Sequence, residues 1–230
     1  NPNLGRDAGV VANIEPLGVK IISDAKIFFE NCEAVIDFSF AGATIENITN
    51  ASKNNCTYVL GTTGLEAEQV MQIKDLSKTI PIMCSANMSI GVNIALHYSE
   101  QLAKSLDEEY DIEIHEMHHK DKLDSPSGTA LALGKAVAKG RGIDLEQKII
   151  KPRWGIEQPR KKGGIGFSTQ RGGDVIGDHV VTFAGNGERI EIGHKASNRD
   201  IFANGAVRAL LWLHNKSVGY YSMKDVLGLN

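Results

Sequence analysis

Cysteine is scarce in this sequence: the 230 residues contain three, Cys32, Cys56 and Cys84, far apart and without a C-x-x-C pair. This usage favours buried, reduced thiols over disulfides or a cysteine-based metal site. The chain also lacks the apolar run of about 20 residues that a membrane helix needs. Its start has neither the basic region nor the apolar region of a signal peptide. These absences predict a cytoplasmic protein with no membrane partner.

An excess of either charge is missing as well, because 25 Lys and Arg stand against 28 Asp and Glu, for a net charge of −3. Such a balance gives no electrostatic reason to expect a nucleic acid as partner. With 42% hydrophobic residues, the composition is that of a globular protein. The length suffices for one large domain or two small ones.

The first third of the chain alternates between two patterns. The stretches 33–39, 57–64 and 80–87 are short and apolar and end in polar residues, as buried strands do. Between them, 41–55 and 65–79 repeat apolar residues every three or four positions, as amphipathic helices do. This order predicts a parallel sheet of the Rossmann type.

Ligands of such sheets bind at the carboxyl ends of the strands. The polar ends of the three predicted strands are therefore candidate contacts: Phe38, Ser39, Gly61, Thr62, Thr63, Gly64, Ser85, Ala86, Asn87 and Met88.

From Ser89 onward the pattern is that of an α+β unit. We expect helices at 89–106 and 127–139, a strand at 109–119, a long loop at 151–164, strands of a largely antiparallel sheet at 165–172, 179–185 and 188–196, and a closing helix at 200–215. The predicted fold class is thus α/β, with an inserted α+β domain whose sheet is mostly antiparallel and open. We predict one domain from residues 1–88 and 200–230, and a second from 89–199.

A glycine loop of the G-x-G-x-x-G type is absent, although a nucleotide-binding fold normally opens with a strand, this loop and a helix. The chain does not begin with Met either. We therefore expect that the first βαβ unit of the parallel domain is missing from this chain.

Residues 115–119, His-Glu-Met-His-His, match the H-E-x-x-H pattern of zinc proteases. That motif needs a helix, which brings positions i and i+4 within about 5–6 Å. The alternation before it predicts a strand, in which His115 and His119 lie about 13 Å apart. A zinc hydrolase is therefore a poor interpretation, and we predict no metal.

The residues after this strand point to a different chemistry. Ser127, Gly128 and Thr129 open a predicted helix, whose free N–H groups attract carboxylate or phosphate. Lys122 adds a cation, and an imidazole titrates near neutrality, as a general acid or base should. We infer an anion-binding site with proton transfer.

The stretch "HHKDKLDSPSGTA" resembles the signature H-H-x-x-K-x-D-x-P-S-G-T-A of the 4-hydroxy-tetrahydrodipicolinate reductases, also called dihydrodipicolinate reductases. The similarity covers nearly the whole chain, because "VIDFS", "VLGTTG", "SANMSIGVN", "GFSTQRGGDVIGDH", "GERIEIGHKASNR" and "FANGAVRALLWL" follow in the family's order. The family reduces a cyclic dicarboxylate of the diaminopimelate–lysine pathway with NADH or NADPH.

The resemblance implies a role for each matching residue. His118 is the expected proton donor, Lys122 a second donor, and His119 a substrate contact. Ser127, Gly128 and Thr129 are expected to bind a substrate carboxylate, and the carboxyl domain to build a homotetramer. The expected cofactor contacts are Phe38, Ser39, Gly61, Thr62, Thr63, Ser85, Ala86, Asn87, Met88 and Arg199.

Two departures from the family pattern matter. The glycine loop and the residues that distinguish NADH from NADPH are absent from this chain, so the sequence gives no cofactor preference. Met88 stands where an aromatic residue is common. Two alternatives remain open at this point: another two-domain nicotinamide oxidoreductase, and a noncatalytic, reductase-like binding protein.

Overall fold

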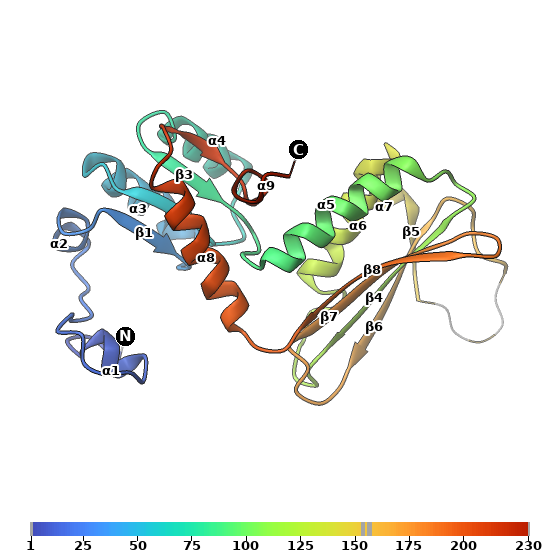
Figure 1. Ribbon diagram of the computed structural model, residues 1–230, viewed down its shortest axis with the longest axis horizontal. Helices are drawn as coiled ribbons and strands as arrows, with labels where there is room; N and C mark the ends of the chain where they lie inside the picture. The colour runs from blue at the N-terminus through green and yellow to red at the C-terminus, as the bar shows by residue number, and fades with distance from the viewer. Residues whose placement is uncertain (1, 153–154, 156–157, 230) are drawn as a thin grey trace. The chain divides into compact units, whose positions relative to one another are not determined.

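The computed structural model describes residues 2–152, 155 and 158–229 (Figure 1). Residue contacts divide the chain into two units: Asn1–Ala86 with Val207–Ser222, and Asn87–Ala206 with Met223–Asn230. Among the described residues, no helix combines the length and apolar character that crossing a membrane requires.

The first unit contains the predicted parallel sheet. Strands β1 (Ala34–Asp37), β2 (Thr57–Leu60), β3 (Pro81–Cys84) and β9 (Gly219–Tyr221) pair in that order, and each pair is parallel. Helices α3 (Ala41–Lys53) and α4 (Ala67–Leu76) connect the first three strands, as the periodicity predicts. All four residues of β2 are buried, which fits a central strand of a parallel sheet.

The helices of this unit bury one face each. Ile48 and Ala51 of α3 and Ile73 of α4 join Tyr58 and Leu60 of β2 in one apolar core. Burying an aliphatic side chain stabilises a fold by about 1.5–3 kcal/mol, so these positions hold the helices on the sheet.

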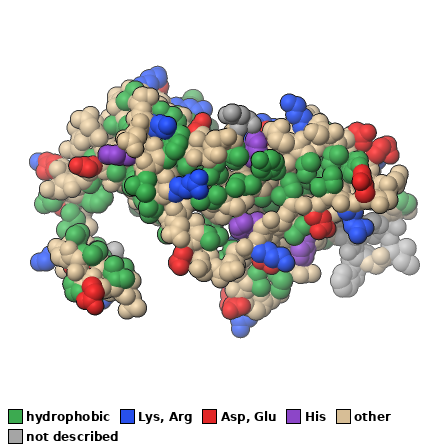
Figure 2. All heavy atoms as spheres, viewed as in Figure 1, with side chains coloured by type: hydrophobic (Ala, Val, Ile, Leu, Met, Phe, Trp, Pro, Cys, Tyr) green, Lys and Arg blue, Asp and Glu red, His purple; other side chains and the backbone are tan. Residues whose placement is uncertain are grey.

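Residues 2–33 form short elements outside this sheet. Helix α1 (Ala8–Val11) is capped by the Asp7 carboxylate, and α2 (Ala25–Glu30) contributes Phe29 to the core. The segment around α1 exposes several large apolar side chains (Figure 2): Leu4, Val10, Ile14, Leu17 and Val19. It therefore adds little to the buried core of the unit.

The second unit is a sheet covered by helices. Its strands are β4 (Asp111–His118), β5 (Ile149–Ile150), β6 (Ile165–Arg171), β7 (Gly177–Ala184) and β8 (Arg189–Ala196), in the order β5-β6-β4-β7-β8. The pairs β4–β7 and β7–β8 are antiparallel, whereas β4–β6 and β5–β6 are parallel. Helices α5 (Ile90–Ser105) and α6 (Gly128–Arg141) lie over the sheet (Figure 1), and the short helix α7 (Leu145–Lys148) precedes β5. The predicted α/β fold class is confirmed, and the second sheet, which was predicted to be mostly antiparallel, is mixed because β6 pairs in parallel with β4 and β5.

Strand β4 alternates between its two faces. Ile112, Ile114, Glu116 and His118 are buried, whereas Glu113 is exposed. The two isoleucines lie in the core with Leu133 and Val137 of α6. The same face therefore carries apolar residues at its beginning and ionisable ones at its end.

The two units differ from the predicted domains at their borders. Helix α8 (Asp200–Leu213) is divided at Ala206, and the last helix, α9 (Met223–Leu227), belongs to the second unit. The first part of α8 belongs to the second unit because Gly205 packs against the backbone of Met88, so closely that a Cβ would be 1.8 Å from the Met88 carbonyl oxygen. Helix α9 belongs to the second unit because the Lys224 ammonium donates to Glu100 of α5 at 3.0 Å.

Part of the predicted loop 151–164, residues 153–154 and 156–157, lies outside the described residues.

Candidate active site

Helix α6 begins directly beside the end of β4. Ser127 is its N-cap, and the Ser127 Oγ accepts a hydrogen bond from the Ala130 amide at 3.1 Å. Gly128 is exposed, and a Cβ at this position would meet no described atom within 4 Å. The first turn therefore presents backbone N–H groups to an anionic ligand with open space in front of them.

Glu116 accepts four hydrogen bonds at the centre of the site. Its Oε1 accepts from the Ser127 amide at 3.1 Å, and its Oε2 accepts from His118 Nδ1. The Arg171 guanidinium donates to both oxygens at 3.0 Å each. Burial raises the pKa of Glu116, but the donors from Arg171, His118 and Ser127 outweigh it and hold the pKa below its ordinary value. Glu116 is therefore an ionised carboxylate with a relative exposure of 1%.

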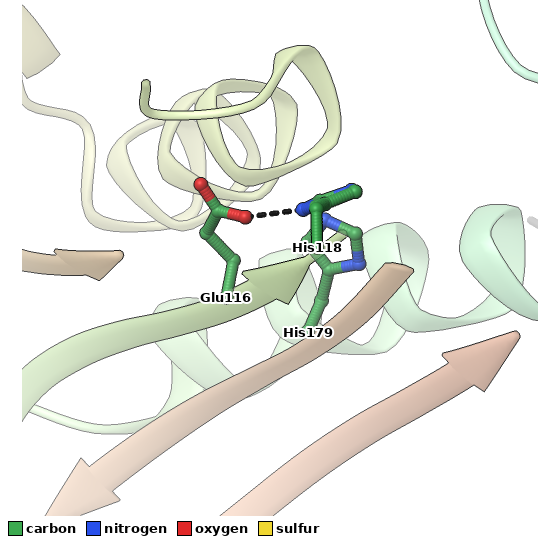
Figure 3. Close-up of side chains that lie close together, drawn as sticks. All are labelled: Glu116, His118 and His179. Atoms are coloured by element: carbon green, nitrogen blue, oxygen red, sulfur yellow. Dashed lines mark hydrogen bonds and ion pairs between the residues drawn. The ribbon is translucent and has the colours of Figure 1, made fainter. Parts of the chain in front are cut away.

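The His118 imidazole has one nitrogen left for chemistry. Its Nδ1 faces Glu116, so the Nε2 is the atom that can exchange a proton with a ligand (Figure 3). Gly177 of β7 makes room for it, because a Cβ there would lie 2.9 Å from the His118 Nε2. Burial lowers the pKa of His118, and the Glu116 carboxylate opposes that effect without cancelling it.

His179 is the cross-strand neighbour of Glu116 in the β4–β7 pair. Its ring packs edge-on against that of His118, with centroids 5.1 Å apart, and its Nε2 lies 3.0 Å from the Ser127 Oγ. Burial lowers the pKa of His179 to about 4, so this histidine is neutral at physiological pH. Its Nδ1 is buried without a hydrogen-bond partner among the described residues.

Lys122 lies in the turn between β4 and α6. Its ammonium donates to Asp124 Oδ1 at 2.7 Å. Arg171 braces this turn by donating to the carbonyls of Lys122 and Asp124 at 3.3 and 2.6 Å. The charge of Lys122 contributes to the lowered pKa of His118, so the two predicted proton donors interact electrostatically. His119 follows the end of β4 and is half-buried.

Three donor groups of the site also fulfil the distance requirement for a metal ion. Ligand atoms of Glu116, His118 and His179 all lie within 4.8 Å of one another (Figure 3). A cation bound there would share the Glu116 carboxylate with the Arg171 guanidinium, which repels it. We therefore assign no metal to this cluster.

The zinc-protease interpretation fails on secondary structure, as expected. Residues 111–118 form a strand, and His115 points away from the site, with its Nδ1 3.1 Å from the Ser168 Oγ.

The predicted cofactor contacts of the first unit follow three adjacent strands. Asp37 pairs with Leu60, and Leu60 with Cys84, so the residues after them lie at one edge of the sheet. The Asp37 carboxylate holds this edge together by accepting from the Ser39 amide at 2.7 Å and the Thr62 hydroxyl at 3.3 Å. This leaves Thr62 buried and Thr63 exposed.

Gly61 lets the Phe38 ring lie directly against the backbone, because a Cβ there would approach the ring to 2.3 Å. Ser85 and Ala86 follow β3 in the same unit.

The remaining predicted cofactor contacts belong to the second unit. Met88 has a relative exposure of 2%, and Asn87 donates from its amide nitrogen to the Thr129 hydroxyl at 3.3 Å. Arg199 is exposed in the turn before α8. The role of all three as cofactor contacts stays a prediction.

Sequence reasoning missed Glu116, Arg171 and His179. The sequence did contain a signal for Glu116, because the alternation of the strand places it on the same inward face as His118, two positions away. Arg171 and His179 come from other strands, and the strand register that brings them to the site was not readable from the sequence.

Together, the fold and this site define a two-unit α/β protein with a buried histidine–carboxylate pair beside an open helix start, and comparison with known proteins identifies it as an oxidoreductase. The model of the family "Dihydrodipicolinate reductase, N-terminus" matches residues 1–88, and that of "Dihydrodipicolinate reductase, C-terminus" matches residues 91–227. The chain belongs to the dihydrodipicolinate reductase family.

Similar proteins agree with this assignment. A 4-hydroxy-tetrahydrodipicolinate reductase of Rhodopseudomonas palustris strain BisA53 is 48% identical over 98% of this chain and 83% of its own length. One from Afipia carboxidovorans is 47% identical with the same coverage. A solved dihydrodipicolinate reductase from Paenisporosarcina sp. TG-14, described as dipicolinate-bound, has the same fold, with a TM-score of 0.68 and 23% identity over 93% of this chain and 74% of that one.

Proposed function

We propose that this chain reduces 4-hydroxy-tetrahydrodipicolinate to tetrahydrodipicolinate with NADPH or NADH, in the diaminopimelate route of lysine biosynthesis. Family membership and the activity of relatives at 47–48% identity support the reaction. The structural observation that carries it is the shared carboxylate of Glu116. One oxygen accepts from His118 and the other from the Ser127 amide. The same side chain therefore holds both the proton donor and the anion-binding start of α6 in place.

In this proposal, the start of α6 holds a carboxylate of the substrate. The Gly128 and Thr129 amides and the Ser127 and Thr129 hydroxyls are the donors, and His119 is a further contact. The Lys122 ammonium adds charge that fixes the anion and orients its ring. The substrate of the family is a ring with two carboxylates, and dipicolinate, named with the Paenisporosarcina structure, is a ligand of the same chemical class.

His118 then protonates the reduced substrate. The 4-hydroxyl of the substrate leaves as water and gives a conjugated C=C–C=N system, and hydride addition to that system leaves an electron pair that a proton must take up. The protonated imidazole delivers this proton from Nε2, while Nδ1 stays on Glu116. Lys122 is the proposed second donor, and its charge also disfavours a second positive charge on His118.

The nicotinamide ring supplies the hydride when the cofactor is bound. The carboxyl edge of the parallel sheet fits such a ligand, because exposed Ser39 and Thr63 stand beside an exposed aromatic ring, Phe38. Phe38, Ser39, Gly61, Thr62, Thr63, Ser85 and Ala86 are the proposed contacts in this unit. A cytoplasmic location also stays a proposal.

A substrate panel tests the reaction. Purified protein should oxidise NADPH or NADH when 4-hydroxy-tetrahydrodipicolinate is present, and should not do so with 2-oxo acids and ammonium, the substrates of amino-acid dehydrogenases. Turnover with the 2-oxo acids alone would replace the proposal by the rival oxidoreductase. Binding of the dicarboxylate without any turnover would make the chain a noncatalytic binding protein.

A further inference from the structure

We propose that Glu116 is a positioning residue, which fixes the tautomer and direction of His118 and ties them to the start of α6. This inference rests on the proposed function, and it adds a residue to which the family signature gives no role.

Four hydrogen bonds fix the orientation of the Glu116 carboxylate. Each carboxylate oxygen accepts one hydrogen bond from Arg171, and each accepts one more, from His118 or from the Ser127 amide. A bidentate guanidinium–carboxylate pair fixes the plane of the carboxylate. Because that plane is fixed, the direction in which the His118 Nδ1–H must point is fixed too.

An ionised carboxylate can only accept hydrogen bonds, so it selects one form of its neighbour. His118 must keep a proton on Nδ1, and its Nε2 is then the nitrogen that gains and loses the exchangeable proton. The opposite tautomer would place two acceptors against each other. Glu116 therefore directs the acid chemistry of His118 to the nitrogen that faces Gly177 rather than the carboxylate.

The Glu116 carboxylate also links two parts of the site, the end of β4 and the start of α6. A movement of β4 relative to α6 breaks either the His118 bond or the Ser127 bond, since both end on one rigid group. Arg171 extends this coupling, because it also donates to the carbonyls of Lys122 and Asp124 in the connecting turn. The distance between the proton donor and the anion-binding amides is thus held by one partly buried ion pair, Glu116–Arg171.

Several charged groups surround His118 and set its protonation. Glu116 on its own strand favours the imidazolium, whereas Lys122 and Arg171 oppose it. His179 packs against the ring from β7 and is neutral at physiological pH. Glu116 is the one negative charge among these named groups, so its removal disfavours the proton-donating form of His118.

Glu116→Gln is the test, because it keeps the shape of the side chain and removes its charge. We expect kcat to fall by at least about tenfold, and by no more than the roughly 10²–10⁴-fold that general acid catalysis contributes in total. The substrate KM should change by less than about threefold, which is under 1 kcal/mol of binding. The descending limb of kcat against pH should move to lower pH, since neutral glutamine no longer favours the imidazolium.

A matched control lies on the same strand. Glu113→Gln removes a carboxylate from the opposite face of β4, where it pairs with Arg160 at 2.9 Å, and should leave kcat and its pH profile unchanged. A uniform loss of kcat with an unmoved pH limb would make Glu116 merely structural and overturn the inference.

Glu116→Asp covers the case in which the glutamine variant does not fold. It keeps the charge but shortens the side chain by one methylene, so it cannot reach Ser127 and His118 together. We expect folded protein with at least about tenfold lower kcat. Wild-type kcat in this variant would overturn the inference. Failure of the wild-type protein itself to turn over 4-hydroxy-tetrahydrodipicolinate would instead reject the proposed function.

Discussion

At the scale of single residues, the burial of His179 in the site lowers the stability of the fold at acid pH. Its ring is buried, with a relative exposure of 4%, and its pKa is lowered from 6.5 to about 4, mainly by burial. A histidine in the unfolded chain takes up a proton near pH 6.5, whereas the folded protein takes it up only near pH 4. Acid therefore favours the unfolded state through this group.

We expect the free energy of unfolding to fall between pH 6.5 and pH 4, with a contribution from His179 on the order of 3 kcal/mol. Above pH 6.5 this group contributes no pH dependence, because it is neutral in both states. Urea unfolding at a series of pH values measures the effect. The His179→Gln variant, which cannot titrate, should have the shallower pH dependence; equal slopes for both proteins would refute the assignment.

The residues of the site were predictable to different degrees. His118, Lys122 and Ser127 lie within ten residues of one another in the sequence, and their chemistry is visible in one stretch. Glu116 could have been found from the alternation of β4, since an acidic residue on a buried face needs a partner. Its partner Arg171 is 55 positions away, and only the pairing of β4 with β6 brings it near.

At the scale of elements, the start of α6 joins helix geometry to ligand binding. Gly128 has a conformation open to any residue and space for a Cβ, so the fold itself does not require glycine there. The proposed function explains it instead, because a bare backbone lets a carboxylate reach the first N–H groups of the helix.

The Gly128→Ala variant should therefore raise the substrate KM without lowering the free energy of unfolding. We expect the free energy of unfolding to stay constant or rise by up to about 1 kcal/mol, because alanine reduces the entropy of the unfolded chain. The substrate KM should rise by about tenfold, which corresponds to about 1.4 kcal/mol of binding. Thermal unfolding and steady-state kinetics on the same preparation measure both.

Gly134→Ala in the same helix provides the contrast. Its Cβ would lie 2.6 Å from the Phe167 ring, so stability should fall while KM stays constant. An unchanged KM in Gly128→Ala would place the carboxylate elsewhere.

Helices and strands with a local sequence pattern were predictable, whereas the pairing of strands was not. The period of apolar residues predicted α3, α4, α5 and α6, and alternation predicted β4, because these patterns are local. The two-residue strand β5 and the three-residue strand β9 are too short to carry a pattern, and they form because a neighbouring strand offers its edge.

At the scale of the whole molecule, the second unit contains all the residues that the proposal gives to proton transfer and substrate binding. The first unit contributes a parallel sheet whose carboxyl edge suits a nucleotide. The division of binding roles between the two, and the assembly into a homotetramer that the family resemblance implies, remain proposals.

Light scattering coupled to gel filtration tests the assembly. We expect a mass about four times the 24.9 kDa of this chain, with no change on dilution to assay concentrations. A mass equal to that of one chain would contradict the tetramer and leave the chemistry of the second unit untouched.

The kinetics of His118→Ala test proton donation by His118 most directly. NADPH oxidation is followed with 4-hydroxy-tetrahydrodipicolinate as substrate, and His115→Ala, from the opposite face of β4, is the control. We expect kcat of His118→Ala to fall by about 10²–10⁴-fold with KM within about threefold of wild type, and His115→Ala to resemble wild type. A kcat for His118→Ala equal to that of the control, or a loss confined to KM, would show that another group supplies the proton.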